Sequence, residues 1–251
     1  MPERLKIFPS EYSPEISSEW EKMAKNAIRL LLRTVTQEIV VEGKNNIPED
    51  IGRASYVVAV NHLGWAEAVV LLDIFPTWIH WMTKSGNFDH KLLGPVFRIL
   101  GFFPVRRGKV DRKALGIASS LLEKGRILGM APEGTRGRGD KFGRLKKAKH
   151  GTIFIAHQAR VPIIPTAVWG TEALFPLIEE KGLKLEDLTE FKRPEVFVRI
   201  GQPFTQHLDV EPKKLNKKKL EALTTDLMLE IRNMLPEEYW GVYAEIERQP
   251  V

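Results

Sequence analysis

The chain has 251 residues, of which 43% are hydrophobic and 28% charged, and its formal net charge is +6. This composition excludes a wholly disordered chain, and the excess of basic residues favours an anionic partner such as nucleic acid, a lipid surface or a phosphorylated small molecule. There are no cysteines, which excludes disulfides, thiolate metal ligands and a cysteine acyl-enzyme. Because no eighteen apolar residues run together, we expect neither a transmembrane span nor a signal peptide.

Residues 1–15 contain three prolines and are expected to form an irregular lead-in. A helix is predicted from Ser17 or Ser18 to Val35, with apolar residues at helical spacing and lysines and arginines between them. Such a basic amphipathic helix can lie in an anionic membrane interface. Alternatively, it can pack on its own domain and leave a solvated charged face.

Short apolar strands and helices alternate along the rest of the chain. Strands are predicted at residues 39–42, 56–60, 78–84, 126–131, 161–169 and 195–200, with a further strand ending in PVRRG (104–108); helices are predicted at 66–75, 111–123, 152–158 and 215–235. This alternation is typical of an α/β fold with a mainly parallel central sheet flanked by helices. Two prolines within 161–169 favour a strand at the edge of the sheet, or an irregular approach to it.

The strand at 56–60 ends directly before Asn61 and His62. Ligands of open α/β sheets bind beyond the carboxyl ends of the strands, so this polar pair is well placed for chemistry. Glu67, in the first turns of the next predicted helix, could accept a hydrogen bond from one ring nitrogen of His62 and leave the other free to act as a base. The alternative is a histidine that makes a structural hydrogen bond only.

Three other stretches each allow two interpretations. The apolar residues of 88–103 could fill the core, or they could line a slot for a hydrocarbon chain or dip into lipid. The glycine-rich basic stretch 132–151 could bind phosphate through main-chain N–H groups and arginines, or it could be a solvated loop. The lysine cluster at 213–219 is either a solvated face or a second patch for a membrane surface.

Four blocks of the sequence, taken in order, resemble the glycerolipid acyltransferase family, which contains the 1-acylglycerol-3-phosphate acyltransferases. The family's first block is NHxxxxD and the others correspond here to GFFPVRR (101–107), EGTR (133–136) and VPIIP (161–165). The resemblance implies acyl transfer from a thioester, acyl-CoA or acyl carrier protein, to the hydroxyl of a lysophospholipid, most directly 1-acylglycerol-3-phosphate, which would give phosphatidic acid. It implies His62 as the general base, oriented by Glu67, with no covalent acyl-enzyme and no cofactor beyond the thioester co-substrate.

The resemblance also implies an acceptor site with bound phosphate. The residues it assigns to this site are Arg107, Glu133, Gly134, Thr135 and Arg136, with Lys84, Lys149 and His150 as further phosphate or oxyanion contacts. We expect no metal site, because the six histidines show no ligand spacing with one another. The expected partners are an anionic phospholipid surface, the two substrates and, as one of the two alternative acyl donors, acyl carrier protein; nucleic acid is not expected.

The expected organisation is a single acyltransferase domain, 1–251, that is cytoplasmic and peripheral at the inner face of the membrane. It would comprise a lead-in and membrane-surface helix (1–37), a catalytic α/β core (38–205) and a C-terminal helical segment (206–251). In one place the chain departs from the family, since Glu67 stands at the aspartate position and is longer by one methylene. A phospholipid-binding homologue with weak or no catalysis is therefore the alternative hypothesis, and we predict that Glu67→Asp keeps or raises activity.

Overall fold

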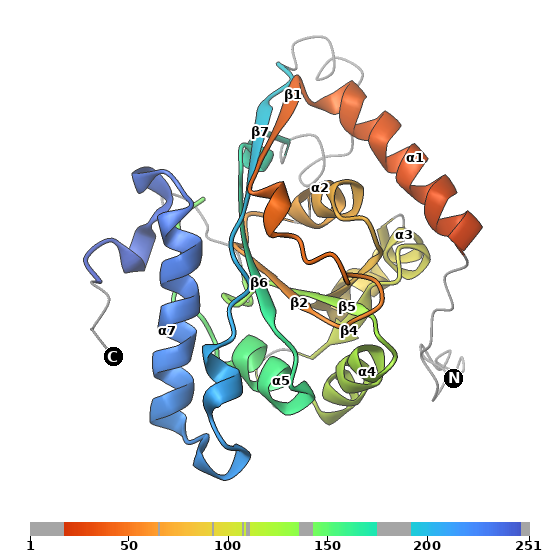
Figure 1. Cartoon of the computed structure of the whole chain (residues 1–251). Helices are drawn as coiled ribbons and strands as arrows, with labels where there is room; N and C mark the ends of the chain where they lie inside the picture. The colour runs from red at the N-terminus through yellow and green to blue at the C-terminus, as the bar shows by residue number, and fades with distance from the viewer. Residues whose placement is uncertain are drawn as a thin grey trace, which may run out of the picture.

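A mixed sheet with helices on both faces forms the centre of the molecule (Figure 1). The structure is a computed structural model, and it describes residues 18–64, 66–91, 93–106, 108, 111–135, 143–174 and 192–246. The strand order is β1-β7-β6-β2-β5-β3-β4, and every neighbouring pair is parallel except β6 with β7. The predicted α/β fold with a mainly parallel sheet is therefore confirmed.

The elements follow the predicted alternation closely. The strands are β1 (Glu38–Glu42), β2 (Val57–Val60), β3 (Ile79–Lys84), β4 (Phe103–Val105), β5 (Ile127–Met130), β6 (Ile163–Trp169) and β7 (Glu195–Ile200). The helices are α1 (Ser18–Val35), α2 (Ala66–Ile74), α3 (Leu93–Ile99), α4 (Arg112–Glu123), α5 (Gly151–Ala159) and α7 (Lys217–Asn233). The predicted lead-in at 1–15 lies outside the described residues.

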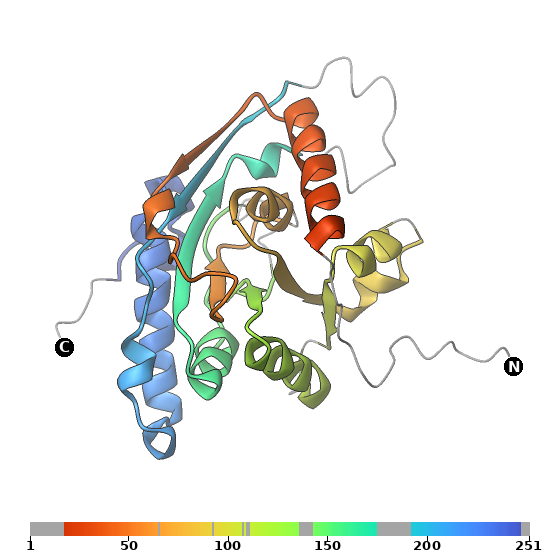
Figure 2. The same cartoon turned by 45° about the vertical axis from the view of Figure 1, so that its right-hand side comes forward.

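The two faces of the sheet pack against different helices (Figure 2). In β2, Val57 and Ala59 belong to the cluster that contains α4, α5 and α7, whereas Val58 and Val60 belong to the cluster that contains α1, α2 and α3. Successive side chains of a strand point to opposite faces, so a strand that is covered on both faces must be apolar throughout. The four residues of β2 are at most 2% exposed, as its unbroken apolar sequence predicted.

Strand β6 lies inside the sheet, between β2 and β7, so the expectation of an edge strand was wrong. The carbonyl of Pro165 accepts a hydrogen bond from Gly201 N at 2.8 Å, and the proline nitrogen therefore faces the same side, just past the end of β7. Thr166 pairs with Ile200, and Ile163 pairs with Phe204. The stretch from Ile200 to Phe204 therefore contains one residue more than the stretch of β6 that it faces. This extra residue is a bulge, and a bulge tolerates a residue without an N–H group.

Helix α1 covers α2 and leaves part of its own apolar surface exposed. Its Lys25 Nζ donates to Phe75 O at 2.7 Å, and Arg29 lies 2.9 Å from the Asp73 carboxylate. Ile28 and Leu32 of α1 are buried, but three large apolar side chains of the same helix are 50–70% exposed: Met23, Leu30 and Leu31. The predicted N-terminal amphipathic helix is therefore confirmed. Within the described ranges, no helix combines the length and the apolar character needed to cross a bilayer.

Candidate active site

A cavity of about 800 Å³ lies beyond the carboxyl ends of four neighbouring parallel strands. Its wall includes His62 after β2, Thr83 near the end of β3, Arg106 after β4 and Pro132 after β5. Parts of α2, α4 and α5 and Leu220 of α7 also belong to the wall. The position is the one that open α/β sheets use for ligands, which makes this cavity the candidate active site.

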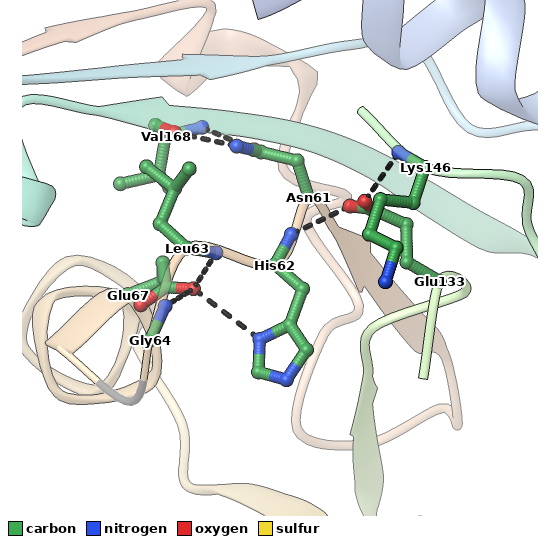
Figure 3. A network of polar contacts seen from close by, with 8 residues as sticks. All are labelled: Asn61, His62, Leu63, Gly64, Glu67, Glu133, Lys146 and Val168. Carbon is green, nitrogen blue, oxygen red and sulfur yellow. Dashed lines mark hydrogen bonds and ion pairs between the residues drawn. The ribbon is translucent and has the colours of Figure 1, made fainter. Parts of the chain in front are cut away.

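Hydrogen bonds across the sheet fix the turn that carries His62. The side-chain amide of Asn61 donates to Val168 O and accepts from Val168 N, both at 2.8 Å (Figure 3). This pairing ties the end of β2 to β6 through both the nitrogen and the oxygen of the amide. His62 follows directly, with a side chain that is 19% exposed and lies in the cavity wall.

Glu67, in the first turn of α2, reaches back over the turn that precedes the helix. Its Oε1 accepts hydrogen bonds from Leu63 N at 2.6 Å and from Gly64 N at 2.7 Å, and it lies 3.6 Å from His62 Nδ1 (Figure 3). The last distance is that of an ion pair rather than of a good hydrogen bond. Glu67 is only 2% exposed, and its Oε2 is buried without a hydrogen-bond partner among the described residues.

This arrangement suits the imidazole of His62 to proton transfer. Nδ1 faces the Glu67 carboxylate, whereas the other ring nitrogen points away from it (Figure 3). A carboxylate beside Nδ1 favours the tautomer with a proton on that nitrogen, so Nε2 keeps a free electron pair. The same carboxylate would stabilise the imidazolium that forms when Nε2 takes up a proton.

Glu133 lies behind His62 and outside the cavity wall. It is 2% exposed, and its two oxygens accept hydrogen bonds from His62 N at 2.8 Å and Lys146 N at 2.7 Å. Burial raises the pKa of Glu133 to about 7, although these two hydrogen bonds act in the opposite direction. Both of its carboxylate oxygens are thus engaged with the main chain, whereas the predicted contact of Glu133 with the acceptor stays a prediction.

Three of the other predicted residues are brought together in the cavity wall: Gly134, Lys149 and His150. Gly134 has φ of +67°, a conformation that glycine adopts without strain. The Lys149 side chain runs beside it, about 3.5 Å from the position that a Cβ would take. His150 Nδ1 lies 3.2 Å from Thr224 Oγ1, which connects this part of the wall to α7.

The remaining predicted residues are not in the described cavity wall. Lys84 is exposed at the end of β3, and Thr135 is described but is not part of the wall. Arg107 and Arg136 lie outside the described residues, as do 137–142 of the glycine-rich basic stretch. The predicted contacts of these two arginines with phosphate stay predictions.

Sequence reasoning missed Arg106 and Asp111, both of which line the cavity. Asp111 Oδ2 accepts from Arg106 N at 2.9 Å and lies 3.4 Å from Arg106 Nε, while its Oδ1 accepts from the first N–H groups of α4. Burial raises the pKa of Asp111, but the main-chain hydrogen bonds and the Arg106 guanidinium outweigh it, so that this pKa is lowered. The available signals were the pair of adjacent arginines and an aspartate directly before a predicted helix.

Most of the wall is apolar, and the stretch 88–103 contributes only a little to it. Phe102 lines the cavity, whereas Phe88 and Phe97 are buried in the core. Val96 and Ile99 are instead 44% and 60% exposed at the surface. The other large apolar side chains of the wall come from outside this stretch: Trp81, Met82, Leu115, Met130, Phe154, Ile155 and Leu220.

The fold and the site together define a class of enzyme site. An α/β sheet presents a histidine beside a buried carboxylate, in an apolar cavity whose wall also carries an arginine and a lysine. Such a cavity suits a substrate that has a hydrocarbon part and an anionic part, and its histidine can act on a hydroxyl group.

Comparisons with known proteins identify the family. Residues 38–169, more than half of the chain, match the Acyltransferase family. The 1-acyl-sn-glycerol-3-phosphate acyltransferase of Bacillus subtilis is 29% identical over 218 residues, which are 85% of this chain and 96% of that protein. A chloroplast 1-acyl-sn-glycerol-3-phosphate acyltransferase of Arabidopsis thaliana is 30% identical over 143 residues, which are 55% of this chain and 38% of that protein.

A solved structure agrees with this match. The crystal structure of the 1-acyl-sn-glycerophosphate acyltransferase PlsC of Thermotoga maritima has a TM-score of 0.54 and 25% sequence identity, over 83% of this chain and 77% of that one. The chain therefore belongs to the acyltransferase family, as an O-acyltransferase with a PlsC-like α/β fold.

Proposed function

We propose that this protein transfers an acyl group from a thioester to the free hydroxyl of 1-acylglycerol-3-phosphate, giving phosphatidic acid. The observation that carries the proposal is the pairing of His62 with Glu67 in the wall of the cavity. The size and apolar character of the cavity suit acyl chains, and Arg106 and Lys149 offer positive charge to a phosphate. The names of the relatives from Bacillus and Arabidopsis support the choice of acceptor.

In the proposed reaction, Nε2 of His62 takes the proton of the acceptor hydroxyl while the hydroxyl oxygen attacks the thioester carbonyl. Glu67 stabilises the imidazolium that results, at 3.6 Å from Nδ1. The tetrahedral intermediate then collapses, the carbon–sulfur bond breaks, and the thiolate takes the proton from the imidazolium. The acyl group passes directly between substrates, with no covalent acyl-enzyme.

The proposal includes a position at a membrane surface, because the acceptor and the product are lipids. Met23, Leu30 and Leu31 of α1 are at least half exposed, and basic residues lie between them in the sequence. Exposed apolar side chains with interleaved lysines and arginines favour the interface of an anionic membrane. The donor is acyl-CoA or an acylated carrier protein, and the expected location is the inner, cytoplasmic face of the membrane.

The direct test supplies purified protein with anionic vesicles, 1-acylglycerol-3-phosphate and either acyl-CoA or acyl carrier protein thioester. We expect phosphatidic acid by mass spectrometry, in amounts equal to the free thiol released. His62→Ala should abolish both products, and His90→Ala, which changes an exposed histidine outside the cavity wall, should abolish neither. Thiol release that is independent of the acceptor would instead indicate a thioester hydrolase, and normal turnover by the His62→Ala variant would refute the general base.

One observation favours a second candidate, a phospholipid-binding homologue with little or no catalysis. The Glu67 carboxylate hydrogen-bonds the main chain of Leu63 and Gly64 and stays 3.6 Å from the His62 ring. Held in this way, it orients the imidazole less strictly than a direct hydrogen bond would. Saturable binding of 1-acylglycerol-3-phosphate without formation of phosphatidic acid from either donor would select this candidate.

A further inference from the structure

One buried carboxylate joins the candidate base to the chain segment that leads to Lys149 in the cavity wall. Glu133 Oε1 accepts from the main-chain N–H of His62, and Glu133 Oε2 accepts from that of Lys146 (Figure 3). Both distances, 2.8 and 2.7 Å, are those of charge-assisted hydrogen bonds. At 2% exposure and outside the cavity wall, this side chain has no route to a bound phosphate in the arrangement observed.

The segment on the far side of Glu133 leads to the basic part of the wall. Lys146 is three residues before Lys149, which lines the cavity and whose N–H donates to Pro132 O at 2.9 Å. Leu145 N donates in turn to Tyr239 O at 2.8 Å, which ties the same segment to the C-terminal region. Glu133 thus links the main chain of His62 to the segment that carries Lys149.

We propose that Glu133 is a positioning residue for the acyl transfer, which holds the main chain of His62 against the segment that carries Lys149, and that it does not bind the acceptor. This inference rests on the function proposed above. It differs from what the EGTR resemblance implied, because the glutamate serves the geometry of the base and leaves the phosphate to other residues.

The negative charge of Glu133 is part of this role. An ionised carboxylate accepts at both oxygens, but a protonated one presents a hydrogen to one of the two main-chain donors and loses that bond. Burial raises the pKa of Glu133 to about 7, so the change falls near neutral pH. The titratable groups that interact with it are His62, Glu67 and, from the C-terminal region, Tyr243. Two buried carboxylates therefore act on His62, one beside its ring and one at its main chain.

Glu133→Gln tests the inference because glutamine keeps the shape but can accept at one oxygen only. Loss of a hydrogen bond to a charged group lowers kcat by about tenfold to a hundredfold. The KM for 1-acylglycerol-3-phosphate should change by less than about threefold, since uniform substrate binding is untouched. The acidic limb of the kcat against pH profile should move to lower pH, because the carboxyl group whose protonation near neutral pH breaks one of its two main-chain contacts is gone.

Glu133→Asp is the paired variant, since it keeps the charge and withdraws the carboxylate by one methylene. We expect it to lower kcat while its acidic limb stays near that of the wild type. Glu42→Gln, an exposed glutamate of β1, is the matched control and should leave both parameters unchanged. Circular dichroism of each variant establishes that it is folded, and if Glu133→Gln does not fold, the rate and pH profile of Glu133→Asp decide the question.

Two results would overturn the inference. A KM for 1-acylglycerol-3-phosphate raised more than about tenfold at constant kcat would make Glu133 an acceptor contact. A lower kcat with the same pH profile in Glu133→Gln as in Glu133→Asp would reduce its role to structure alone. Failure of the wild-type protein to form phosphatidic acid is a separate outcome, which refutes the proposed function before any variant is compared.

Discussion

Replacing Glu67 with glutamine removes the charge beside His62 and leaves the shape of the side chain nearly unchanged. Glutamine retains an oxygen that can accept from Leu63 N and Gly64 N, as Oε1 of Glu67 does at 2.6 and 2.7 Å. Its NH₂ group would take the place of Oε2, which has no partner among the described residues. The variant therefore separates the electrostatic role of Glu67 from its role in holding the turn.

The size of the effect follows from the 3.6 Å between Glu67 Oε1 and His62 Nδ1. Two unit charges at this distance interact by about 4 to 5 kcal/mol at an effective dielectric constant of about 20. The two main-chain N–H groups already bind the same oxygen and weaken its potential, so we expect about half of this, about 2 kcal/mol, to act on the imidazolium of the transition state. A loss of about 2 kcal/mol corresponds to a fall in kcat of about thirtyfold.

The measurement is the initial rate of phosphatidic acid formation at saturating donor and acceptor, for the wild type, Glu67→Gln and His62→Ala. Thermal unfolding of the three proteins provides the control, and Glu67→Gln should melt close to the wild type because the hydrogen bonds of the turn persist. A kcat for Glu67→Gln within about threefold of the wild type, in a folded protein, would refute the reasoning. Glu67 would then hold the turn without stabilising the charge on His62.

Three further changes test separate contacts. Glu67→Asp should lower the free energy of unfolding by about 1 to 3 kcal/mol in urea titrations, because the shorter side chain leaves the buried N–H groups of the turn unpaired. An unchanged free energy of unfolding would show that the main chain follows the carboxylate. Burial lowers the pKa of His80 to about 4, although a hydrogen bond with the backbone of Gly101 acts in the opposite direction. Because the unfolded chain takes up this proton first, the free energy of unfolding is highest above about pH 6.5 and falls as the pH decreases towards 4. His80→Gln should flatten this loss of up to about 3 kcal/mol, and an equally steep acid limb in the variant would contradict the assignment. Arg106→Ala should raise the KM for 1-acylglycerol-3-phosphate by about tenfold with kcat little changed, whereas an unchanged KM would remove Arg106 from the phosphate site.

The strands and the position of His62 were predictable because local sequence decides them. A strand covered on both faces must be apolar, and the unbroken run of β2 ends where the sheet presents its ligand site. Helices α4 and α7 were predictable for a similar reason, since they begin directly after Asp111 and Asn216, whose side chains accept hydrogen bonds from the first turn.

The directions of side chains in the turns were not predictable in this way. Of two adjacent arginines, a sequence does not tell which one enters a cavity, and here Arg106 lies in the wall while Arg107 is not among the described residues. Lys84 matches a family position but is exposed at the end of β3. Glu133 belongs to a motif that implied a phosphate contact, yet its partners are main-chain groups 71 and 13 residues away.

Of the two alternatives for β6, the edge strand was wrong, because the neighbouring chain accommodates Pro165 inside the sheet. Pro165 has no N–H group to donate to a neighbouring strand. The sheet tolerates this because a bulge lies opposite Pro165, at Gly201 and the residues that follow. That bulge involves a strand 30 residues further along the chain, so no local pattern around Pro165 contains the information.

The strand order also has a consequence for how the protein folds. The strands β2 to β6, which include every strand bordering the cavity, come from residues 57–169 and pair with one another. Among the described strands, β1 pairs only with β7, and the Glu42–Arg199 contact across this pair spans 157 residues. Closing so long a loop is entropically costly, and contacts of this kind slow folding. As the chain leaves the ribosome, the part that holds His62 can assemble from its own strands, whereas β1, the earliest of the described strands, must wait for β7, the latest of them.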